Sequence, residues 1–533
     1  MITAMNLHHR YWRASLTGFC GLAILLLTAC APLTNPPAAG KTVFSRIQAT
    51  EVFAAGFSGV TEKYIDPVPA GDIAIEGIRG LGAIDPRLTV SSTGGKVVLL
   101  ADGREVTRLA APPSDDVNGW AALTTDIIIT ARQASTELQT ADMEAVYEAV
   151  FDGVLSNLDI FSRYAGAEEA KKNRSKRDGF GGIGIRYRIA DELPLLIDIL
   201  PDTPAESAGL AKGDRLTHAD GVPLKGLNRK EISNILRGPT YTRIELTLMR
   251  PGTSAPLTVA MNRAHIFPVT ITQNITDGIV IIKVKSFNQD TARSLAEKLE
   301  MARLSLGDSM KGLVLDLRGN PGGLLKQSVK VSDLLLTQGQ IISTRGRHAD
   351  SIHYYEAGGR DLAYGLPVVV LVDGKSASAA EIVAAALQDR DRAVVIGTSS
   401  FGKGSVQTVL RLPNDGEITL TWSRLVAPSG YTFHGLGVRP AICTSNAKDN
   451  AQDKAKEIIR RVLNNRSKTQ DTLVAWRTPG LQNESIRARL RDSCPSQTRG
   501  NDLEAKIARQ LINDPALFTR ALNLTADTHQ ALY

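Results

Sequence analysis

The sequence predicts a multidomain α+β protein with a helical N-terminal region, a small β domain, an α/β core and a helical C-terminal extension. Three observations predict this order. The 533 residues are 43% hydrophobic and 22% charged, an ordinary globular composition with enough chain for about three domains. Short strands and turns fill residues 178–263, and strands alternate with helices over residues 264–444. Residues 445–533 are polar and mostly helical in pattern.

Residues 1–29 are typical of a secretory signal. Basic residues precede an apolar run, Leu16 to Leu27, which is too short for a membrane-spanning helix. The Leu-Thr-Ala sequence before Cys30 resembles a bacterial lipoprotein signal, which implies cleavage before Cys30 and acylation of that cysteine. A plain signal peptide is the alternative. The Pro- and Ala-rich stretch that follows predicts a lipid-anchored tether over residues 30–55.

This signal predicts a place on the periplasmic side of a bacterial cell envelope. We expect the outer membrane rather than the inner one, because Ala31 and not an aspartate follows Cys30. Such a compartment permits disulfides. Once Cys20 leaves with the signal, Cys443 and Cys494 remain, and we expect them to pair. The alternative is two separate buried thiols.

Charge and ligand spacing exclude other classes of protein. The formal charge of +7 is modest for this length, and most basic residues are dispersed. The one dense run, Lys171 to Arg177, is typical of a solvated connector, so we expect no nucleic-acid partner. No group of His and Cys residues has metal-ligand spacing. The sequence therefore predicts neither a metal site nor a cofactor.

We expect a mainly helical region over residues 56–177 and a β domain over residues 178–263. The steps Gly209-Leu210, Gly213-Asp214 and Asp220-Gly221 come in the order that PDZ domains show, so this β domain resembles a PDZ domain. Glycines near the start of this domain allow backbone amides to face outward in one turn, and such a nest can hold a terminal carboxylate. The strand beside it can pair with an extended peptide. A sheet domain without a ligand is the alternative. The expected peptide-binding residues are Phe180, Gly181, Gly182 and Ile183.

Residues 264–444 predict a core with a covered, largely parallel sheet. Apolar runs of the buried type occur after Gly312, from Val368 and from Ala393, with helical patterns between them. In such a sheet, ligand chemistry gathers at the loops that follow the carboxyl ends of the strands. We therefore expect the reactive side chains in these loops.

Ser378 follows one of these strands and opens an alanine-rich helix. The free amides and partial positive charge of a helix N-terminus would stabilise an alkoxide and the oxyanion formed later. Two alternatives stay open. Ser378 and Glu381 fit a capping box, so the serine could serve only to cap the helix. Ser376 is a rival nucleophile by the same reasoning.

Lys403 favours the catalytic interpretation of Ser378, because a neutral lysine can take a proton from a serine hydroxyl. Lowering a lysine pKa from about 10.4 to near 7 requires roughly 4–5 kcal/mol, which burial can supply. An exposed turn lysine is the alternative. The segment from Gly397 to Lys403 also approaches a phosphate-loop pattern, but a strand-like stretch follows where that motif needs a helix.

Gly322 and Gly323 follow the strand that ends near Arg318. A glycine amide can approach a substrate carbonyl closely, so one of them, with the amide of Ala379, could form an oxyanion hole. A simple Pro-Gly turn is the alternative. Nothing in the sequence ties a histidine to Ser378, and most histidines are expected to be structural or surface residues; the scattered ones are His265, His348, His353 and His434.

Three motifs in order resemble the carboxyl-terminal processing peptidases, a serine peptidase family (S41) with a PDZ domain before the catalytic core. They are Asp316-LRGNPGG, Ser376-ASAAEIVAAALQD and Phe401-GKGSVQT. The resemblance implies a ClpP/crotonase-like core of sheet and helices. It also implies a role for each matching residue: Ser378 as nucleophile, Lys403 as general base, Gln407 orienting the lysine, Ala379 with Gly322 or Gly323 as oxyanion donors, and Glu381 near the site.

The predicted function is therefore that of a periplasmic serine endopeptidase. Its PDZ domain would capture protein C-termini, and a Ser378–Lys403 dyad would cleave them through an acyl-enzyme. Its partners would be peptide C-termini and, through the lipid anchor, a membrane. An activating adaptor protein and further copies of the same chain, in a homo-oligomer, are additional candidate partners. The alternative is a catalytically silent PDZ-containing adaptor or peptide-binding lipoprotein.

Overall fold

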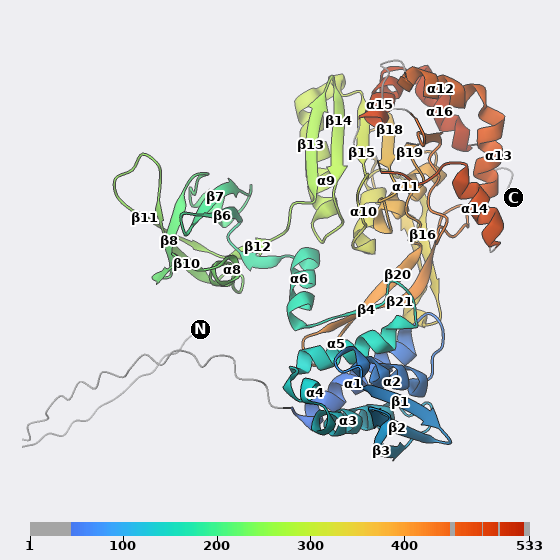
Figure 1. Ribbon diagram of the computed structural model, residues 1–533. Coiled ribbons are helices and arrows are strands. Elements are labelled where there is room, and N and C mark those ends of the chain that lie inside the picture. The colour runs from blue at the N-terminus through green and yellow to red at the C-terminus, as the bar shows by residue number, and fades with distance from the viewer. Residues whose placement is uncertain (1–43, 448–453, 482, 499–501, 527–533) are drawn as a thin grey trace, which may run out of the picture. The chain divides into compact units, whose positions relative to one another are not determined.

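Figure 1 shows a computed structural model of the chain, which describes residues 44–447, 454–481, 483–498 and 502–526. The predicted signal, Cys30 and residues 30–43 of the predicted tether lie outside the described residues. Within those ranges no helix is both long enough and apolar enough to cross a membrane. Four clusters of buried apolar side chains organise the described chain.

The N-terminal region is mainly helical, as predicted, with one small antiparallel sheet of order β1-β2-β3. Helix α1 begins at Arg46, so residues 46–55, which we expected to be tether, are helical. Val52 and Phe53 are fully buried there, because apolar residues at helical spacing face the cluster around Phe151. The elements are α1 (Arg46–Lys63), α2 (Ala70–Arg79), β1 (Leu88–Thr93), β2 (Lys96–Ala101), β3 (Arg104–Ala110), α3 (Val117–Ala134), α4 (Thr136–Thr140) and α5 (Met143–Ser156).

A short connector leads from this region to the β domain. Strand β4 (Arg163–Ala165) pairs antiparallel with β21 (Glu417–Val426), a strand that lies far later in the chain. This pairing brings the residues just before β4 to the loops of the core. Helix α6 (Ala167–Asp178) then contains the basic run that the sequence marked as a connector.

The β domain has a sheet of order β11-β10-β8-β7-β6, so β6 is an edge strand. Its own core cluster includes Leu216, Ile232 and Leu246. A separate two-stranded pairing joins β5 to β12. The elements are β5 (Phe180–Gly182), β6 (Ile185–Ala190), β7 (Leu193–Ile199), α7 (Pro204–Ser207), β8 (Arg215–Ala219), β9 (Val222–Pro223), α8 (Arg229–Leu236), β10 (Arg243–Met249), β11 (Leu257–Asn262) and β12 (Ala264–Ile266).

The core sheet has the order β13-β14-β15-β18-β19-β22, and every pairing from β14 to β22 is parallel. The predicted alternation of strand and helix is thereby confirmed. The elements are β13 (Ile271–Thr276), β14 (Ile279–Val284), α9 (Thr291–Leu306), β15 (Gly312–Asp316), α10 (Leu325–Asp333), β18 (Val368–Val372), α11 (Ala379–Asp389), β19 (Val394–Gly397) and β22 (Ile442–Cys443).

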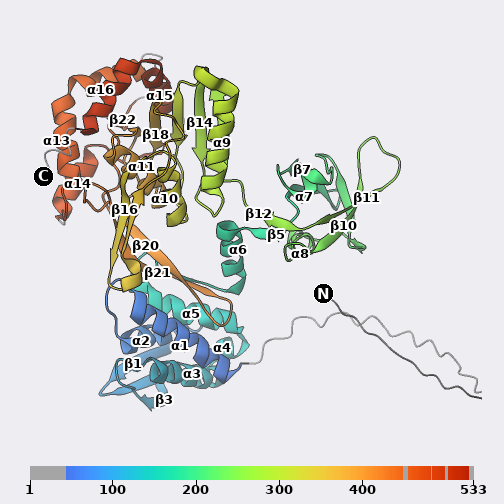
Figure 2. The ribbon, with the colours of Figure 1, turned by 180° about the vertical axis from the view of Figure 1, so that it is seen from behind.

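Successive residues of each central strand face opposite sides of the sheet. In β15, Leu313 and Leu315 join the cluster under α9, α10 and α11, whereas Val314 joins the cluster on the other face. That other face is covered by α12 (Lys454–Asn464), α15 (Leu503–Asn513) and α16 (Pro515–Ala526) of the C-terminal extension (Figure 2). The two helices between them, α13 (Arg466–Trp476) and α14 (Glu484–Asp492), instead pack Trp476 and Leu490 with the first cluster.

A second sheet of order β17-β16-β21-β20 adjoins the core, with β4 added at β21. It consists of β16 (Gly339–Gly346), β17 (His353–Ala357), β20 (Ser405–Arg411) and β21. Cys443 and Cys494 form a disulfide, which joins the end of β22 to the segment after α14. Short 3-10 turns cover Gly80–Ala83, Gly307–Ser309 and Ala349–Ser351.

Candidate active site

Ser378 lies where the loop after β18 turns into α11. Its backbone has a φ of 54° and a ψ of −113°, a region that residues with a side chain rarely adopt. Backbone strain of this kind persists only where the surroundings hold it, and it clusters at functional sites. The turn presents Ser378 at the carboxyl edge of the parallel sheet and at the positive end of α11.

The carboxylate of Glu381 joins the turn of Ser378 to the loop of Lys403. Its Oε2 accepts from the backbone N–H of Ser378 at 2.7 Å and from that of Lys403 at 2.9 Å. Its Oε1 accepts from the Gly402 N–H at 2.7 Å and from the Ser400 hydroxyl at 2.5 Å. Full burial raises the pKa of Glu381, and these hydrogen bonds oppose the rise. One buried carboxylate therefore fixes both loops.

The contact between Glu381 and the Ser378 N–H is also the carboxylate half of a capping box, so the capping interpretation and the catalytic one do not compete. The alternative nucleophile, Ser376, is fully buried. Its hydroxyl donates to the carbonyl oxygen of Leu317 at 2.9 Å and accepts from the Asp373 N–H at 2.9 Å. Ser376 thus holds the turn closed, which leaves Ser378 as the better candidate.

The amine of Lys403 lies 4.8 Å from the centre of the Phe161 ring, in a cation–π arrangement. Burial lowers the pKa of this amine, and the positive charge of Arg163 lowers it further, whereas Asp159 and Glu381 act in the opposite direction. Among the described residues, the amine donates no hydrogen bond to Ser378. Glu381 therefore links the serine and the lysine through their backbones, while their reactive atoms are not bonded to each other.

Gly322 packs directly against the Ser378 turn. A Cβ atom added at Gly322 would lie 2.9 Å from the Ser378 Cβ and 3.1 Å from the Ala379 nitrogen, at a φ of 101°. The Gly322 N–H donates to Asn320 Oδ1 at 2.8 Å and is therefore occupied. Within the described ranges, the N–H groups of Gly323 and Ala379 have no acceptor. The geometry thus favours Gly323 over Gly322 as the second oxyanion donor.

A charge cluster holds the loop that leads to Gly322. The Arg318 guanidinium donates to both oxygens of Asp316, at 3.0 and 2.9 Å, and its pair with Glu504 measures 3.2 Å. The Gly319 N–H donates to Asp373 Oδ1 at 2.9 Å, which ties this loop to the one before Ser378. The loops after β15 and β18 therefore form one connected edge.

Gln407 lies on β20, shortly after Lys403 in the chain. Its Nε2 donates to Ser405 Oγ at 2.9 Å and to Thr421 Oγ1 at 3.3 Å. Gln407 thus lies near the lysine loop, and in the described structure its side chain makes no hydrogen bond with the Lys403 amine. The stretch from Ser405 is a strand, so the loop of Lys403 has no helix N-terminus after it and does not form a phosphate cradle.

Two aromatic residues beside Lys403 carry no local sequence signal that marks them as site residues. Phe161 precedes β4, and the pairing of β4 with β21 brings it to the site. The ring of His434 meets the Phe161 ring edge to face, with centres 6.2 Å apart. Burial, then the charges of Arg424 and Arg487, lower the pKa of His434 to about 4. The histidine is therefore neutral at pH 7, and its Nδ1 is buried without a partner in the described structure.

The residues expected to bind a peptide lie at the start of the β domain. Phe180, Gly181 and Gly182 form β5, and Ile183 is buried behind them. The Arg237 guanidinium lies 3.8 Å above the Phe180 ring. The neighbouring β6 has one unpaired edge, and Tyr187 of this strand bonds to Ser233 of α8 at 2.8 Å. An edge strand beside a helix is the arrangement that accepts an added peptide strand.

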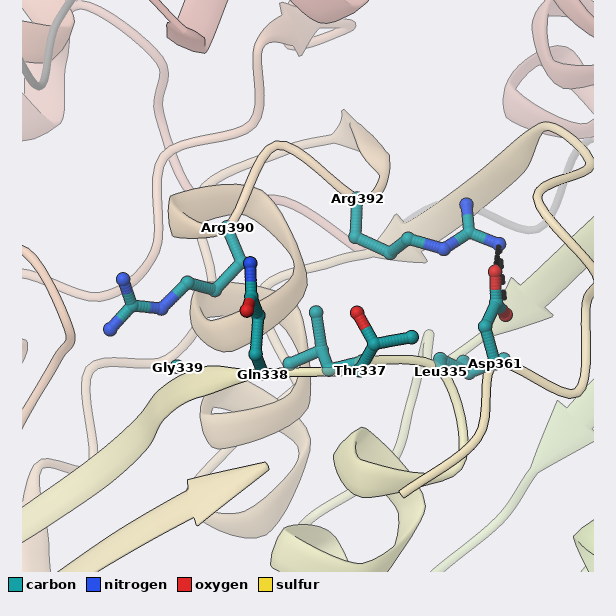
Figure 3. A pocket seen from close by; sticks show the side chains of 8 residues that line it. Leu335, Thr337, Gln338, Gly339, Asp361, Arg390 and Arg392 are labelled. Atoms are coloured by element: carbon teal, nitrogen blue, oxygen red, sulfur yellow. Dashed lines mark hydrogen bonds and ion pairs between the residues drawn. The ribbon is translucent and has the colours of Figure 1, made fainter. Parts of the chain in front are cut away.

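A cavity of about 420 Å³ lies at the other end of α11. Figure 3 shows the ion pair of Asp361 and Arg392 at this cavity, with the Arg390 side chain pointing away from the pair. The eleven residues of α11 separate this cavity from Ser378 by about 16 Å along the helix axis. None of the expected site residues lines it; the lining residues are Leu335, Leu336, Thr337, Gln338, Gly339, Asp361, Arg390 and Arg392.

Comparison with known proteins adds a family to this geometry. The model for peptidase family S41 matches residues 278–444, and a PDZ-domain model matches residues 197–250. A carboxy-terminal-processing protease of Bartonella bacilliformis is 39% identical over 303 residues, which are 56% of this chain and 70% of the relative. The carboxy-terminal processing protease CtpA of Bacillus subtilis is 31% identical over 307 residues, 57% of this chain and 65% of the relative.

Among solved structures, a photosystem II D1 C-terminal processing protease is 22% identical, with a TM-score of 0.37, and covers 75% of this chain and 92% of that one. The sequence matches, together with a covered parallel sheet that carries Ser378 at its carboxyl edge, define a serine peptidase. The chain belongs to peptidase family S41, among the carboxy-terminal processing proteases. The predicted fold class, with a PDZ domain before the peptidase core, is confirmed.

Proposed function

We propose that this peptidase cleaves proteins near their C-termini with a Ser378–Lys403 dyad and a PDZ domain that captures the substrate. The observation that supports the dyad best is the shared carboxylate of Glu381, which holds the backbones of both residues. The lowered pKa of Lys403 supports its role, because only a neutral amine can accept a proton. Glu381 is a positioning residue in this proposal.

The reaction proceeds through an acyl-enzyme. The neutral Lys403 amine takes the proton from Ser378 Oγ while that oxygen bonds to the substrate carbonyl carbon. The N–H groups of Gly323 and Ala379 stabilise the oxyanion. The peptide C–N bond then breaks, and the Lys403 ammonium returns its proton to the leaving amine. A water molecule, deprotonated by Lys403, hydrolyses the ester and regenerates Ser378.

The amine must leave its position over Phe161 to bond with Ser378 Oγ. Gln407 would then accept from the Lys403 ammonium through its amide oxygen and orient it. The PDZ domain supplies substrate through the edge of β6, beside the amides of residues 180–183. Peptide C-termini are thus the proposed partners, and an activating adaptor protein that reorients Lys403 is compatible with this arrangement.

The proposed location is the periplasmic side of a bacterial envelope, with a lipid on Cys30 and the outer membrane favoured. The disulfide between Cys443 and Cys494 supports an oxidising compartment. Metabolic labelling with a palmitate analogue tests the anchor. We expect label in the wild-type membrane fraction and none in Cys30→Ser, which should become soluble. A Cys30→Ser protein that stays in the membrane would contradict this assignment.

A catalytically silent adaptor is the second candidate function. It is favoured by one observation: in the described structure Lys403 contacts Phe161 rather than Ser378. Cleavage of fluorescein-labelled casein separates the two candidates. The peptidase proposal expects cleavage by the wild type, and loss of cleavage in Ser378→Ala and in Lys403→Ala. Lys375→Ala is the matched control, because Lys375 is an exposed lysine in the same loop region. Equal cleavage by all four proteins would contradict the dyad, and cleavage by none of them would favour the silent adaptor.

A further inference from the structure

The C-terminal extension contacts the loop that carries Lys403. Arg491, in the last turn of α14, donates through Nη1 to the carbonyl oxygen of Leu436 at 2.7 Å and to that of Ser400 at 3.3 Å. One turn earlier in the same helix, Arg487 donates to the carbonyl oxygen of His434. Two arginines of one helix thus bind backbone carbonyls of the lysine loop, at Ser400, and of the segment from His434 to Leu436.

Ser400 connects this contact to the catalytic centre. Its hydroxyl donates to Glu381 at 2.5 Å and accepts from the Val438 N–H at 2.7 Å, and its carbonyl oxygen accepts from Arg491. Burial lowers the pKa of Arg491, and the negative charge of Glu381 opposes this effect. Arg491 is therefore a partly buried cation that acts on Glu381 both through Ser400 and through its charge.

The segment after α14 also reaches the loop before Ser378. The carbonyl oxygen of Gln497 accepts from the Gly374 N–H at 2.9 Å and from the Thr398 hydroxyl at 2.8 Å. The fully buried Cys494 lies midway between Arg491 and Gln497, and its disulfide to Cys443 fixes the segment to β22. A single cross-linked stretch, residues 491–497, therefore holds the loops of both proposed catalytic residues.

We propose that Arg491 is a positioning residue for the Ser378–Lys403 dyad and that residues 491–497 form a disulfide-anchored clamp on the catalytic loops. This inference rests on the proposed function. Arg491 holds Ser400, Ser400 helps to hold the Glu381 carboxylate, and Glu381 holds the backbones of Ser378 and Lys403. The C-terminal extension is thus part of the catalytic machinery, although it touches no substrate.

The steady-state kinetics of the full-length protein test this role, with an internally quenched peptide as substrate. The variants are Arg491→Gln, which removes the charge, and Arg491→Lys, which keeps it. Arg489→Gln is the matched control, because Arg489 lies in the same helix and is exposed. A small displacement of catalytic groups costs about ten- to a hundred-fold in rate. We expect that loss in kcat for Arg491→Gln, while KM stays within about two-fold because the PDZ domain is unchanged.

We expect kcat to recover in part in Arg491→Lys, which keeps the charge. In Arg489→Gln, kcat should equal that of the wild type. The labelling rate of Ser378 by a fluorophosphonate should fall in parallel with kcat, since this probe does not use the PDZ domain. Wild-type kcat and labelling rate in Arg491→Gln would overturn the inference. Equal losses in kcat and in affinity, with no recovery by lysine, would overturn it as well, because they indicate only a loosened fold.

A second route covers the case in which Arg491→Gln does not fold. The double variant Cys443→Ser, Cys494→Ser leaves every arginine in place and releases only the cross-link. A lower kcat at unchanged KM supports the clamp, and an unchanged kcat overturns it. Failure of the underlying dyad is distinguishable, because Ser378→Ala would then retain activity. If Ser378→Ala is inactive and the Arg491 variants are fully active, the dyad stands and only the clamp fails.

Discussion

The backbone N–H groups of Ser378 and Lys403 donate to the same oxygen atom, Oε2 of Glu381, at 2.7 and 2.9 Å. The two residues come from loops after different strands, β18 and β19, which lie side by side in the parallel sheet. Removing the hydrogen-bond donors of a buried carboxylate costs several kcal/mol of folding free energy, so the N–H groups that donate to Glu381 are held firmly. The Glu381 side chain therefore fixes the distance between the backbones of Ser378 and Lys403.

Replacement of Glu381 by glutamine should inactivate the enzyme while it keeps the shape of the side chain. The amide nitrogen of the introduced side chain would face donors instead of accepting from them, which leaves buried N–H groups unpaired at about 1–3 kcal/mol each. We expect a large fall in kcat and a lower midpoint of urea unfolding. Glu356→Gln, at an exposed glutamate of β17, is the control. Wild-type kcat in Glu381→Gln would show that the carboxylate is dispensable.

The same carboxylate predicts an acid limit of activity. Burial raises the pKa of Glu381, so protonation begins at a higher pH than for an ordinary glutamate. A protonated carboxyl cannot accept from all its present donors, and the loops should loosen as pH falls. As the pH is lowered, we expect the rate at which a fluorophosphonate labels Ser378 to begin to fall at a pH above the usual pKa range of a glutamate. A decline that starts only below this range would contradict the assigned direction.

Gly322→Ala should abolish activity, whereas Gly319→Ala in the same loop should have a smaller effect. Both glycines have positive φ, so both substitutions strain the backbone. Only at Gly322 would the new methyl group meet the Ser378 turn, 2.9 Å from its Cβ; at Gly319 nothing lies within 4 Å. The difference in kcat between the two variants measures that collision. Equal losses would show that strain alone matters.

Phe161→Leu should shift the pH profile of kcat toward lower pH. The aromatic ring favours the charged form of Lys403, and leucine keeps the site apolar without the ring's negative face. A cation–π contact worth about 0.5–1 kcal/mol corresponds to a shift of about 0.4–0.7 pH units. The quantity to fit is the apparent pKa of the acid limb of the kcat profile, which reflects the ionisation of Lys403. A shift in the opposite direction would mean that the ring keeps the amine neutral.

His434 should make stability depend on pH between about 6.5 and 4. Its pKa is about 4 in the folded protein and near 6.5 when unfolded, so the unfolded state binds the proton first as pH falls. Folding stability is thus full above pH 6.5 and falls as pH drops toward 4. The loss in the free energy of unfolding is smaller than about 3 kcal/mol, because the ring is only part-buried and solvent screens its charge. His434→Gln should unfold with less change in midpoint between about pH 7 and pH 4.5 than the wild type.

The sequence predicted those parts of the fold that leave a local pattern. The apolar runs of β15, β18 and β19 indicated buried parallel strands, and the loops after them contain Gly322, Ser378 and Lys403, as expected. The start of the first helix was placed too late, because the Pro- and Ala-rich tether has no clear boundary with residues 46–55, whose burial depends on contacts from α3 and α5.

Residues that reach the site from distant parts of the chain could not be predicted. Phe161 and Lys403 lie far apart in the sequence, and only the pairing of β4 with β21 brings them together. Arg491 lies in a polar helical extension whose pattern indicates only an amphipathic surface. The same holds for His434, which the sequence showed as one of several scattered histidines.

The most direct test of the central claim is the pH dependence of the rate at which a fluorophosphonate labels Ser378. Besides the acid limit set by Glu381, a neutral lysine as general base predicts an ionisation with a pKa below the ordinary lysine value of about 10.4, lost in Lys403→Ala and retained in His434→Gln. Labelling that survives in Lys403→Ala, or that follows an ionisation near 4 abolished in His434→Gln, would contradict the dyad.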